Sequence, residues 1–234
     1  MDETLTEGLR RLREGDPDFE RLTDGRLEEV SVLLNRYIEE IELFNPAYGL
    51  AAVSGRRELV VKHILDSLAP LSVICRLPGM NGAAPPAQTA ARPRIADVGS
   101  GAGLPGIPLA IVLSGGDFTL IERTGRRAGF LRNVQAVLGL ANVWVEEEEM
   151  RRALPGRFDL AAFRAFRPLE RDTLKSLFRL LRPGGVLAAY KGRREKIEAE
   201  MAAAEPSTGG WEILPVRVPF LEEERHLALI RPPV

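Results

Sequence analysis

Hydrophobic residues recur at three- and four-residue steps in two early stretches of the chain, and each stretch predicts a helix. The first helix begins near Leu27, with Thr23 or Asp24 as its N-terminal cap, and ends at Asn45-Pro46. The second covers about residues 58–68 and places its apolar side chains on one face. The N-terminal part of the chain is therefore expected to be helical.

The pattern changes after residue 77. Residues 78–93 are rich in Pro, Gly and Ala, which is typical of a flexible connection. Apolar strands then alternate with amphipathic helices, which predicts an α/β fold with a doubly wound, mostly parallel sheet. We expect a helical extension over 1–77, a connection over 78–93 and a main domain over 94–234. The expected strands are 94–98, 117–121, 142–145, 158–163, 186–190, 212–218 and 226–231, with helices at 104–113, 126–138, 172–181 and 194–204.

Composition excludes several classes of protein. Cys75 is the only cysteine and His63 and His226 are the only histidines, so neither an internal disulfide nor a zinc centre is expected. No apolar run reaches the roughly 20 residues of a membrane span, and the acidic start of the chain lacks the order of a secretory signal. We expect a cytoplasmic, monomeric protein without metal or membrane contact. The formal charge of −1 hides clusters of arginine that are separate from the acidic stretches.

A glycine-rich loop follows the first strand of the main domain, in the segment Asp97-Val-Gly-Ser-Gly-Ala-Gly-Leu-Pro-Gly106. Glycines let the backbone turn sharply and approach a ligand, and the helix behind the loop offers unpaired N–H groups. Gly101-x-Gly103-x-x-Gly106 also matches the dinucleotide fingerprint, although Gly99 and Ser100 already lie between the strand and that match. A turn without any ligand is the third interpretation.

Three further features bear on the identity of the ligand: Glu122 indicates a ribose in either kind of site, and the other two favour S-adenosylmethionine. Glu122 ends the next strand, where a carboxylate accepts hydrogen bonds from ribose hydroxyls in both kinds of nucleotide site. Asp97 would place a carboxylate near the cationic sulfonium and amino groups of S-adenosylmethionine. Pro183-Gly184-Gly185, between a helix and an apolar strand, is frequent at the fifth strand of class I methyltransferases. Together these features predict a class I, Rossmann-like methyltransferase domain.

Several segments resemble the glucose-inhibited division protein B family, also called RsmG. The matching segments are Asn45-Pro-Ala-Tyr-Gly-Leu50, Lys62-His-Ile-Leu-Asp-Ser-Leu68, Asp97–Pro108, Phe130-Leu-Arg132, Arg164-Ala-Phe166, Lys191-Gly192 and Glu224-Arg-His-Leu227. The resemblance implies a methyltransferase that uses S-adenosyl-L-methionine and modifies guanine N7 in the 530 loop of 16S rRNA, with 16S rRNA or the small ribosomal subunit as partner.

The same resemblance implies the cofactor-binding residues. The loop would contact the cofactor, Glu122 would hold its ribose, and the turn at 150–151 would meet its adenine. The expected cofactor-binding set is Asp97, Gly99, Gly101, Gly103, Leu104, Glu122, Met150, Arg151 and Arg164. The sequence departs from the family pattern around the 150–151 turn, because Glu149 stands where a basic residue is common and Arg151 where an acidic one is.

Further polar residues have two open interpretations. His63, Asp66 and Ser67 share one helical face, and with Lys191 they are candidates for positioning the substrate. The alternative is a hydrogen-bonded network that fixes the helical extension to the sheet. His226 is expected to be structural. The candidate RNA-binding residues follow strand ends, where ligands bind in parallel sheets, and they are Arg123, Arg126, Arg127, Arg193 and Arg194.

Methylation at guanine N7 explains why the sequence has no obvious catalytic base. N7 carries an in-plane lone pair and no proton, so the reaction needs placement and not proton transfer. No catalytic acid or base is therefore expected. A small-molecule methyltransferase of the same fold, an NAD-dependent oxidoreductase and an inactive RNA-binding relative are the competing hypotheses. Activity on free metabolites, or binding of nicotinamide, would distinguish the first two.

Overall fold

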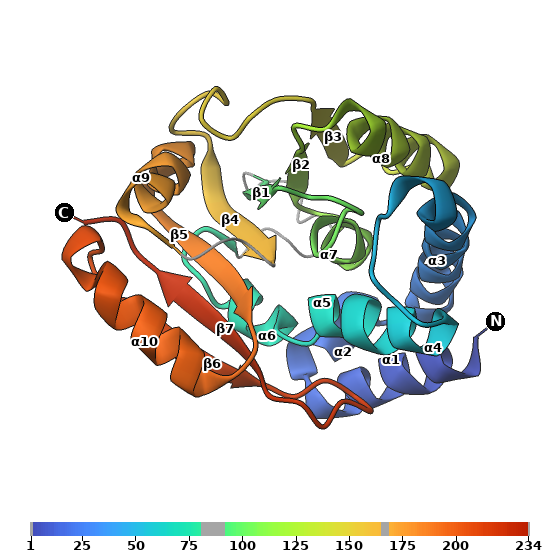
Figure 1. Ribbon diagram of the computed structural model, residues 1–234. Coiled ribbons are helices and arrows are strands. Elements are labelled where there is room, and N and C mark those ends of the chain that lie inside the picture. The colour runs from blue at the N-terminus through green and yellow to red at the C-terminus, as the bar shows by residue number, and fades with distance from the viewer. Residues whose placement is uncertain (1, 81–91, 165–168, 234) are drawn as a thin grey trace.

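The computed structural model describes residues 2–80, 92–164 and 169–233. These residues form one seven-stranded sheet in the order β3-β2-β1-β4-β5-β7-β6, with helices on both faces (Figure 1). The strands are β1 (Arg94–Val98), β2 (Asp117–Ile121), β3 (Val143–Glu146), β4 (Phe158–Arg164), β5 (Leu181–Lys191), β6 (Trp211–Val216) and β7 (Arg225–Ile230). Strands β1 to β5 are parallel, and β7 is antiparallel to both of its neighbours. The mixed α/β fold predicted from the sequence is confirmed.

Two layers of helices enclose the sheet. Helices α9 and α10 cover one face, and α7, α8 and the N-terminal helices cover the other (Figure 1). The N-terminal helical segments are α1 (Glu3–Gly15), α2 (Pro17–Thr23), α3 (Leu27–Tyr48), α4 (Arg56–Leu59), the π-helix η1 (Val60–Leu65), α5 (Asp66–Leu68) and α6 (Leu71–Cys75). The later ones are α7 (Gly106–Val112), α8 (Gly125–Leu138), α9 (Arg171–Leu180), α10 (Arg194–Ala204) and the 3-10 turn η3 (Glu205–Ser207). None of the helices in the described ranges is long and apolar enough to cross a membrane.

The N-terminal helices share a hydrophobic core with one face of the sheet. Leu5 and Leu9 of α1 belong to the same buried cluster as Phe118 of β2 and Leu227 of β7. Helices α1 and α2 were not resolved as separate elements from the sequence, although each begins with an aspartate cap. Asp2 accepts a hydrogen bond from a first-turn N–H at 2.9 Å, and Asp16 caps the start of α2.

The ends of α3 differ from the sequence prediction. The helix continues through Pro46 for two more residues and stops at Gly49, whose φ of 59° reverses the chain. At its start, Arg26 takes the capping position without a side-chain hydrogen bond, so the prediction of Thr23 or Asp24 as the cap was wrong. Both residues instead terminate α2, because a turn separates the two helices there.

The helix predicted over 58–68 is present as the continuous run α4, η1 and α5. Its middle six residues, Val60–Leu65, form a π-helix, whose backbone hydrogen bonds span one residue more than those of an α-helix. Val61, Ile64, Leu65 and Leu68 are buried, as the periodicity predicted. Segments of π-helix often mark functional positions.

The strands beside the glycine loop agree best with the sequence. The bounds of β1 and β2 match their predictions. Strand β5 begins earlier than expected, at Leu181, so that Pro183–Gly185 lie inside the strand and not before it. The pairing with β4 shifts register between Phe158 and Leu160, and this irregularity accommodates the additional residues. The predicted connection over 78–93 falls largely on 81–91, outside the described residues.

Candidate functional site

The glycine-rich loop leaves β1 at the carboxyl edge of the sheet and leads into α7. Gly99, Gly101 and Gly103 have φ values of 71°, 57° and 92°, a backbone conformation that residues other than glycine rarely adopt. A Cβ on Gly103 would lie 2.6 Å from Cγ1 of Ile107, so this glycine is also required for packing. At Gly101 the nearest atom to such a Cβ is 3.9 Å away, which leaves open space over the loop. The loop therefore presents bare backbone beside that space.

Asp97 lies directly beneath the loop and is 1% exposed. Its Oδ2 accepts a hydrogen bond from the Gly106 N–H at 3.0 Å. Its Oδ1 is the only buried side-chain nitrogen or oxygen in the described residues without a hydrogen-bond partner. Burial raises the pKa of this carboxyl to about 7. Buried polar atoms are nearly always paired, so Oδ1 fits a site that receives a positively charged ligand group.

Glu122 brings a second carboxylate to the same loop from the end of β2. Its Oε2 accepts from the Gly101 N–H at 3.0 Å, and its Oε1 accepts from the Thr124 N–H at 2.8 Å. The side chain is fixed by these bonds and is 4% exposed. Each carboxylate oxygen has a further lone pair, so Glu122 can still accept hydrogen bonds from a diol. The structure thus brings Asp97, the glycines and Glu122 together, as the sequence predicted.

A tyrosine of the N-terminal extension also supports the loop. Tyr37 of α3 is fully buried, and its hydroxyl donates a 2.7 Å hydrogen bond to the Ala102 carbonyl. Burial raises the pKa of Tyr37 well above its usual value, so the hydroxyl stays protonated as a donor. Tyr37 lies inside the helix predicted from Leu27 to Asn45-Pro46, but the sequence alone assigned it no role in the site. Only the fold could show that it meets the loop.

Arg164 ends β4 and is held by the helical extension. Its Nη1 donates to the Lys62 carbonyl and to Oδ2 of Asp66, both at 3.2 Å. Its Nη2 donates to Nδ1 of His63 at 2.6 Å. Burial, and then the charge of Arg164, lower the pKa of His63 to about 4, so the imidazole is a neutral acceptor. Asp66 also pairs with Arg225 of β7 at 3.3 Å.

The structure brings Arg164, predicted to bind the cofactor, into contact with His63 and Asp66, which were predicted as a separate cluster. Asp97 pairs with Ala162 in the sheet, and Arg164 lies two residues further along β4, on the same face as Asp97. The predicted cluster of His63 and Asp66 therefore surrounds a predicted cofactor-binding arginine. The network also fixes the extension to the sheet, as the structural interpretation expects, whereas a role of these residues in positioning the substrate stays a prediction.

The remaining positioning candidates are bound to neighbouring groups. Ser67 is fully buried and donates to the His63 carbonyl at 2.6 Å. Lys191 forms two hydrogen bonds with Glu200, at 2.8 and 2.9 Å. His226 is 7% exposed and donates through Nδ1 to the Gly192 carbonyl at 2.6 Å, in agreement with its expected structural role.

The turn expected to meet adenine lies between β3 and β4. Met150 packs against the hydrophobic core on the α9 and α10 face, and the Arg151 side chain is exposed. Arg179 of α9 binds both of their carbonyls, at 3.3 and 2.7 Å. The turn is thus fixed through its backbone, whereas its contact with a cofactor remains a prediction.

The candidate RNA-binding arginines fall into two groups. Arg126 and Arg127 contact carbonyls at the C-terminal end of α3, at 3.3 and 3.4 Å. Arg194 pairs with a glutamate one turn along α10 at 2.7 Å. Arg123 and Arg193 are exposed, and no described side chain pairs with either. These two cations are therefore the most available to an external anion.

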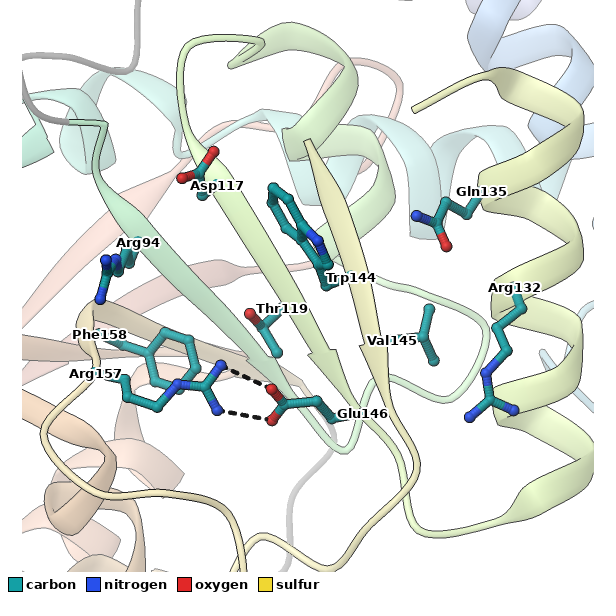
Figure 2. Close-up of a pocket in the computed structure, with 10 residues that line it drawn as sticks. All are labelled: Arg94, Asp117, Thr119, Arg132, Gln135, Trp144, Val145, Glu146, Arg157 and Phe158. Atoms are coloured by element: carbon teal, nitrogen blue, oxygen red, sulfur yellow. Dashed lines mark hydrogen bonds and ion pairs between the residues drawn. The ribbon is translucent and has the colours of Figure 1, made fainter. Parts of the chain in front are cut away.

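A separate cavity of about 560 Å³ lies against strands β1 to β3 (Figure 2). Thr119 and Trp144 line it, and Arg157 forms a paired contact with Glu146 at 2.7 and 3.0 Å. Thr119 pairs with Ala96, the neighbour of Asp97, so it points to the opposite face of the sheet from Asp97. This cavity is distinct from the glycine loop. No cluster of metal-ligating side chains occurs within 2–80, 92–164 and 169–233.

The strand order, the glycine loop and the carboxylate at the end of β2 define a class I S-adenosylmethionine-dependent methyltransferase. The crystal structure of a protein described as a predicted O-methyltransferase from Agrobacterium tumefaciens has this fold. It superimposes with a TM-score of 0.51 at 24% identity, over 71% of this chain and 78% of that one. This likeness shows the fold, and the match of residues 31–228 to an rRNA methyltransferase family makes S-adenosylmethionine the methyl donor.

Residues 31–228 match the family described as rRNA small subunit methyltransferase G, and the chain belongs to this family. The ribosomal RNA small subunit methyltransferase G of Treponema pallidum (strain Nichols) is 41% identical, over 91% of this chain and 90% of its own length. The protein of that name from Stenotrophomonas maltophilia (strain K279a) is 39% identical over 86% of each chain. The resemblance inferred from short sequence segments is confirmed.

Proposed function

We propose that this protein transfers the methyl group of S-adenosylmethionine to N7 of a guanine in the 530 loop of 16S rRNA. The observation that carries the proposal is the unpaired, buried Oδ1 of Asp97 beneath the glycine loop, in a chain that belongs to this family. The substrate would be 16S rRNA or the small ribosomal subunit. A monomeric, cytoplasmic enzyme fits that substrate.

The cofactor would lie over the loop at the carboxyl edge of the sheet. When bound, it supplies a methyl group on a positively charged sulfur, which is an electrophile for an uncharged nitrogen. Gly99, Gly101, Gly103 and Leu104 would contact it through the backbone, with Asp97 near its cationic groups. Glu122 would accept hydrogen bonds from the ribose, Arg164 would bind its polar end, and the backbone of Met150 and Arg151 would meet its adenine.

The chemistry at guanine N7 needs no residue that accepts a proton. N7 has a free lone pair in the plane of the ring, so the side chains must only hold the base in line with the methyl carbon. Such placement is worth about 7–11 kcal/mol in well-oriented systems. The engagement of His63 with Arg164 and of Lys191 with Glu200 is compatible with this requirement, because neither group is needed as a base. An arginine fork on the N7 edge of guanine would block the reaction, which favours a cofactor role for Arg164.

The RNA would be held by arginines near the carboxyl edge of the sheet. Arg123 and Arg193 have no described partner and can bind phosphates directly. Arg126, Arg127 and Arg194 would exchange or share their present contacts. Replacing Arg123 and Arg193 together with alanine should reduce the salt dependence of RNA binding by about one unit per lost phosphate contact. Arg76, whose side chain is 73% exposed and pairs with Asp18 of α2, is an arginine control outside the candidate RNA-binding set.

The target position can be mapped directly. Small subunits from cells that lack this gene are incubated with the enzyme and labelled S-adenosylmethionine. N7-methylguanine becomes sensitive to aniline after reduction, so strand scission followed by primer extension locates it. A single new stop in the 530 loop is expected. Scission in another loop, or incorporated methyl groups that resist this treatment, would show a different target.

A further inference from the structure

The hydrogen bonds from Arg164 to the helical extension leave two of its guanidinium N–H groups free to bind a ligand. Arginine has five N–H donors. Three are used by the helical extension, namely two on Nη1 for the Lys62 carbonyl and Asp66 and one on Nη2 for His63. The Nε–H and the second Nη2–H have no partner among the described residues. These two donors lie on adjacent nitrogens, and a carboxylate can bridge such a pair with two parallel hydrogen bonds.

The charges around Arg164 also leave room for an anion. Asp66 has a 7% exposed side chain and is shared between Arg164 and Arg225, at 3.2 and 3.3 Å. The neighbouring His63 is neutral at physiological pH, and the Lys62 ammonium pairs with Glu58 and Glu223 instead. One carboxylate thus faces two guanidinium groups. Because Asp97, the other carboxyl near Arg164, has a pKa of about 7 and is only partly ionised at neutral pH, the cluster keeps a net positive charge that a further negative group stabilises.

The anion that fits is part of the methyl donor. The methionine end of S-adenosylmethionine carries a carboxylate and an ammonium group on the same carbon. Asp97 offers an unpaired oxygen on the same face of the sheet as Arg164. A group that can bind the ammonium and a group that can bind the carboxylate therefore lie on neighbouring strands. Only the carboxylate matches the free donors of Arg164.

We propose that Asp66, together with His63, is a positioning residue that fixes Arg164 so that its two free donors bind the cofactor carboxylate. This proposal rests on the proposed placement of the cofactor over the glycine loop. The helical extension then determines cofactor affinity through contacts that do not touch the cofactor. Asp66 acts by orientation, because its oxygens face the two arginines and its side chain is only 7% exposed.

The test compares two ligands on one variant. S-adenosylhomocysteine carries the carboxylate, whereas 5′-methylthioadenosine lacks it and keeps the adenosine part. Asp66→Asn removes a negative charge, which alone would strengthen binding of an anion, but the loss of Arg164 orientation should outweigh this and weaken S-adenosylhomocysteine binding about tenfold in calorimetry, the size expected for charge-assisted hydrogen bonds. Unchanged or tighter binding would overturn the positioning role. Binding of 5′-methylthioadenosine should not change. In the Arg164→Ala background, Asp66→Asn should have no further effect, because Asp66 acts through Arg164.

Asp159→Asn is the matched control. Asp159 is also a buried aspartate paired with an arginine, Arg182, but it lies at the amino end of β4. This control should leave binding of both ligands unchanged even if it lowers the free energy of unfolding. If Asp66→Asn does not fold, His63→Leu tests the same idea, because it removes only the acceptor for Nη2 of Arg164.

The outcomes separate the two proposals. Equal weakening of both ligands, or additive losses in the double variant, would overturn the positioning role of Asp66 while leaving the proposed reaction intact. Failure of the unaltered protein to bind S-adenosylhomocysteine would overturn the placement of the cofactor itself.

Discussion

The most informative single perturbation is the protonation of Asp97. Burial raises the pKa of this carboxyl to about 7, against the stabilising hydrogen bond from Gly106 and the nearby charge of Arg164. Glu122 adds to the rise through its own negative charge. The unbound protein therefore holds a proton on Asp97 below neutral pH. A ligand with cationic groups beside Asp97 favours the ionised form, so binding must displace that proton.

The size of the change in cofactor affinity with pH follows from the pKa of Asp97. With a pKa of about 7, roughly nine in ten molecules are protonated at pH 6 and about one in ten at pH 8. Affinity for S-adenosylmethionine should therefore fall about tenfold from pH 8 to pH 6, which corresponds to about 1.4 kcal/mol. His63 does not contribute, because its pKa of about 4 keeps it neutral throughout this range.

The assay is calorimetric titration from pH 6 to pH 8 with the unaltered protein and with Asp97→Asn. The variant should bind more weakly and without this pH dependence. Titration of the ligand itself affects both proteins equally, so the ratio of the two dissociation constants isolates Asp97. A ratio that stays constant across the range would refute the reasoning.

The same pKa implies that the free energy of unfolding falls as pH rises from about 4 to 7, because the folded protein keeps a proton that the unfolded chain releases.

Three further substitutions test the loop and its supports. Glu122→Ala should weaken S-adenosylhomocysteine binding by roughly 1–3 kcal/mol in calorimetry, and an unchanged dissociation constant would remove Glu122 from the site. Tyr37→Phe should lower the free energy of unfolding in urea by about 1–2 kcal/mol, because the buried Ala102 carbonyl loses its donor; equal stability would show that this bond contributes nothing. Gly103→Ala should destabilise the protein by about 1–3 kcal/mol and abolish cofactor binding, since its Cβ would lie 2.6 Å from an α7 side chain. Gly139→Ala has a similar positive φ with no atom within 4 Å, so it controls for backbone strain alone.

The part of the site that follows one continuous segment was predictable from the sequence. Strand β1, the glycines and Glu122 are close along the chain, and their roles depend on local backbone geometry and on the rule that adjacent parallel strands end at the same edge. The matching bounds of β1 and β2 reflect short, apolar strands with glycine at their ends.

The long-range contacts were not predictable in the same way. Arg164 meets His63 and Asp66 across about a hundred residues, and Tyr37 meets Ala102 across 65. Periodicity predicts that a helical face is buried, but it does not tell which surface covers it. Helix ends were also misjudged where local signals compete, as at Pro46, which lies within the last turn of α3 and not beyond it.

The position of β7 in the sheet has a consequence for how the molecule is assembled during synthesis. Strand β7 lies between β5 and β6 and is the only described strand that pairs with β6. Until Arg225–Ile230 have been made, β6 has nothing to pair with and β5 remains an open edge. Leu227 and Leu229 of β7 also complete the core that the earliest helices occupy. The core around the first helices, α1 and α2, is thus completed only by a strand that is synthesised more than two hundred residues later. The nascent chain therefore exposes apolar surface for most of its translation.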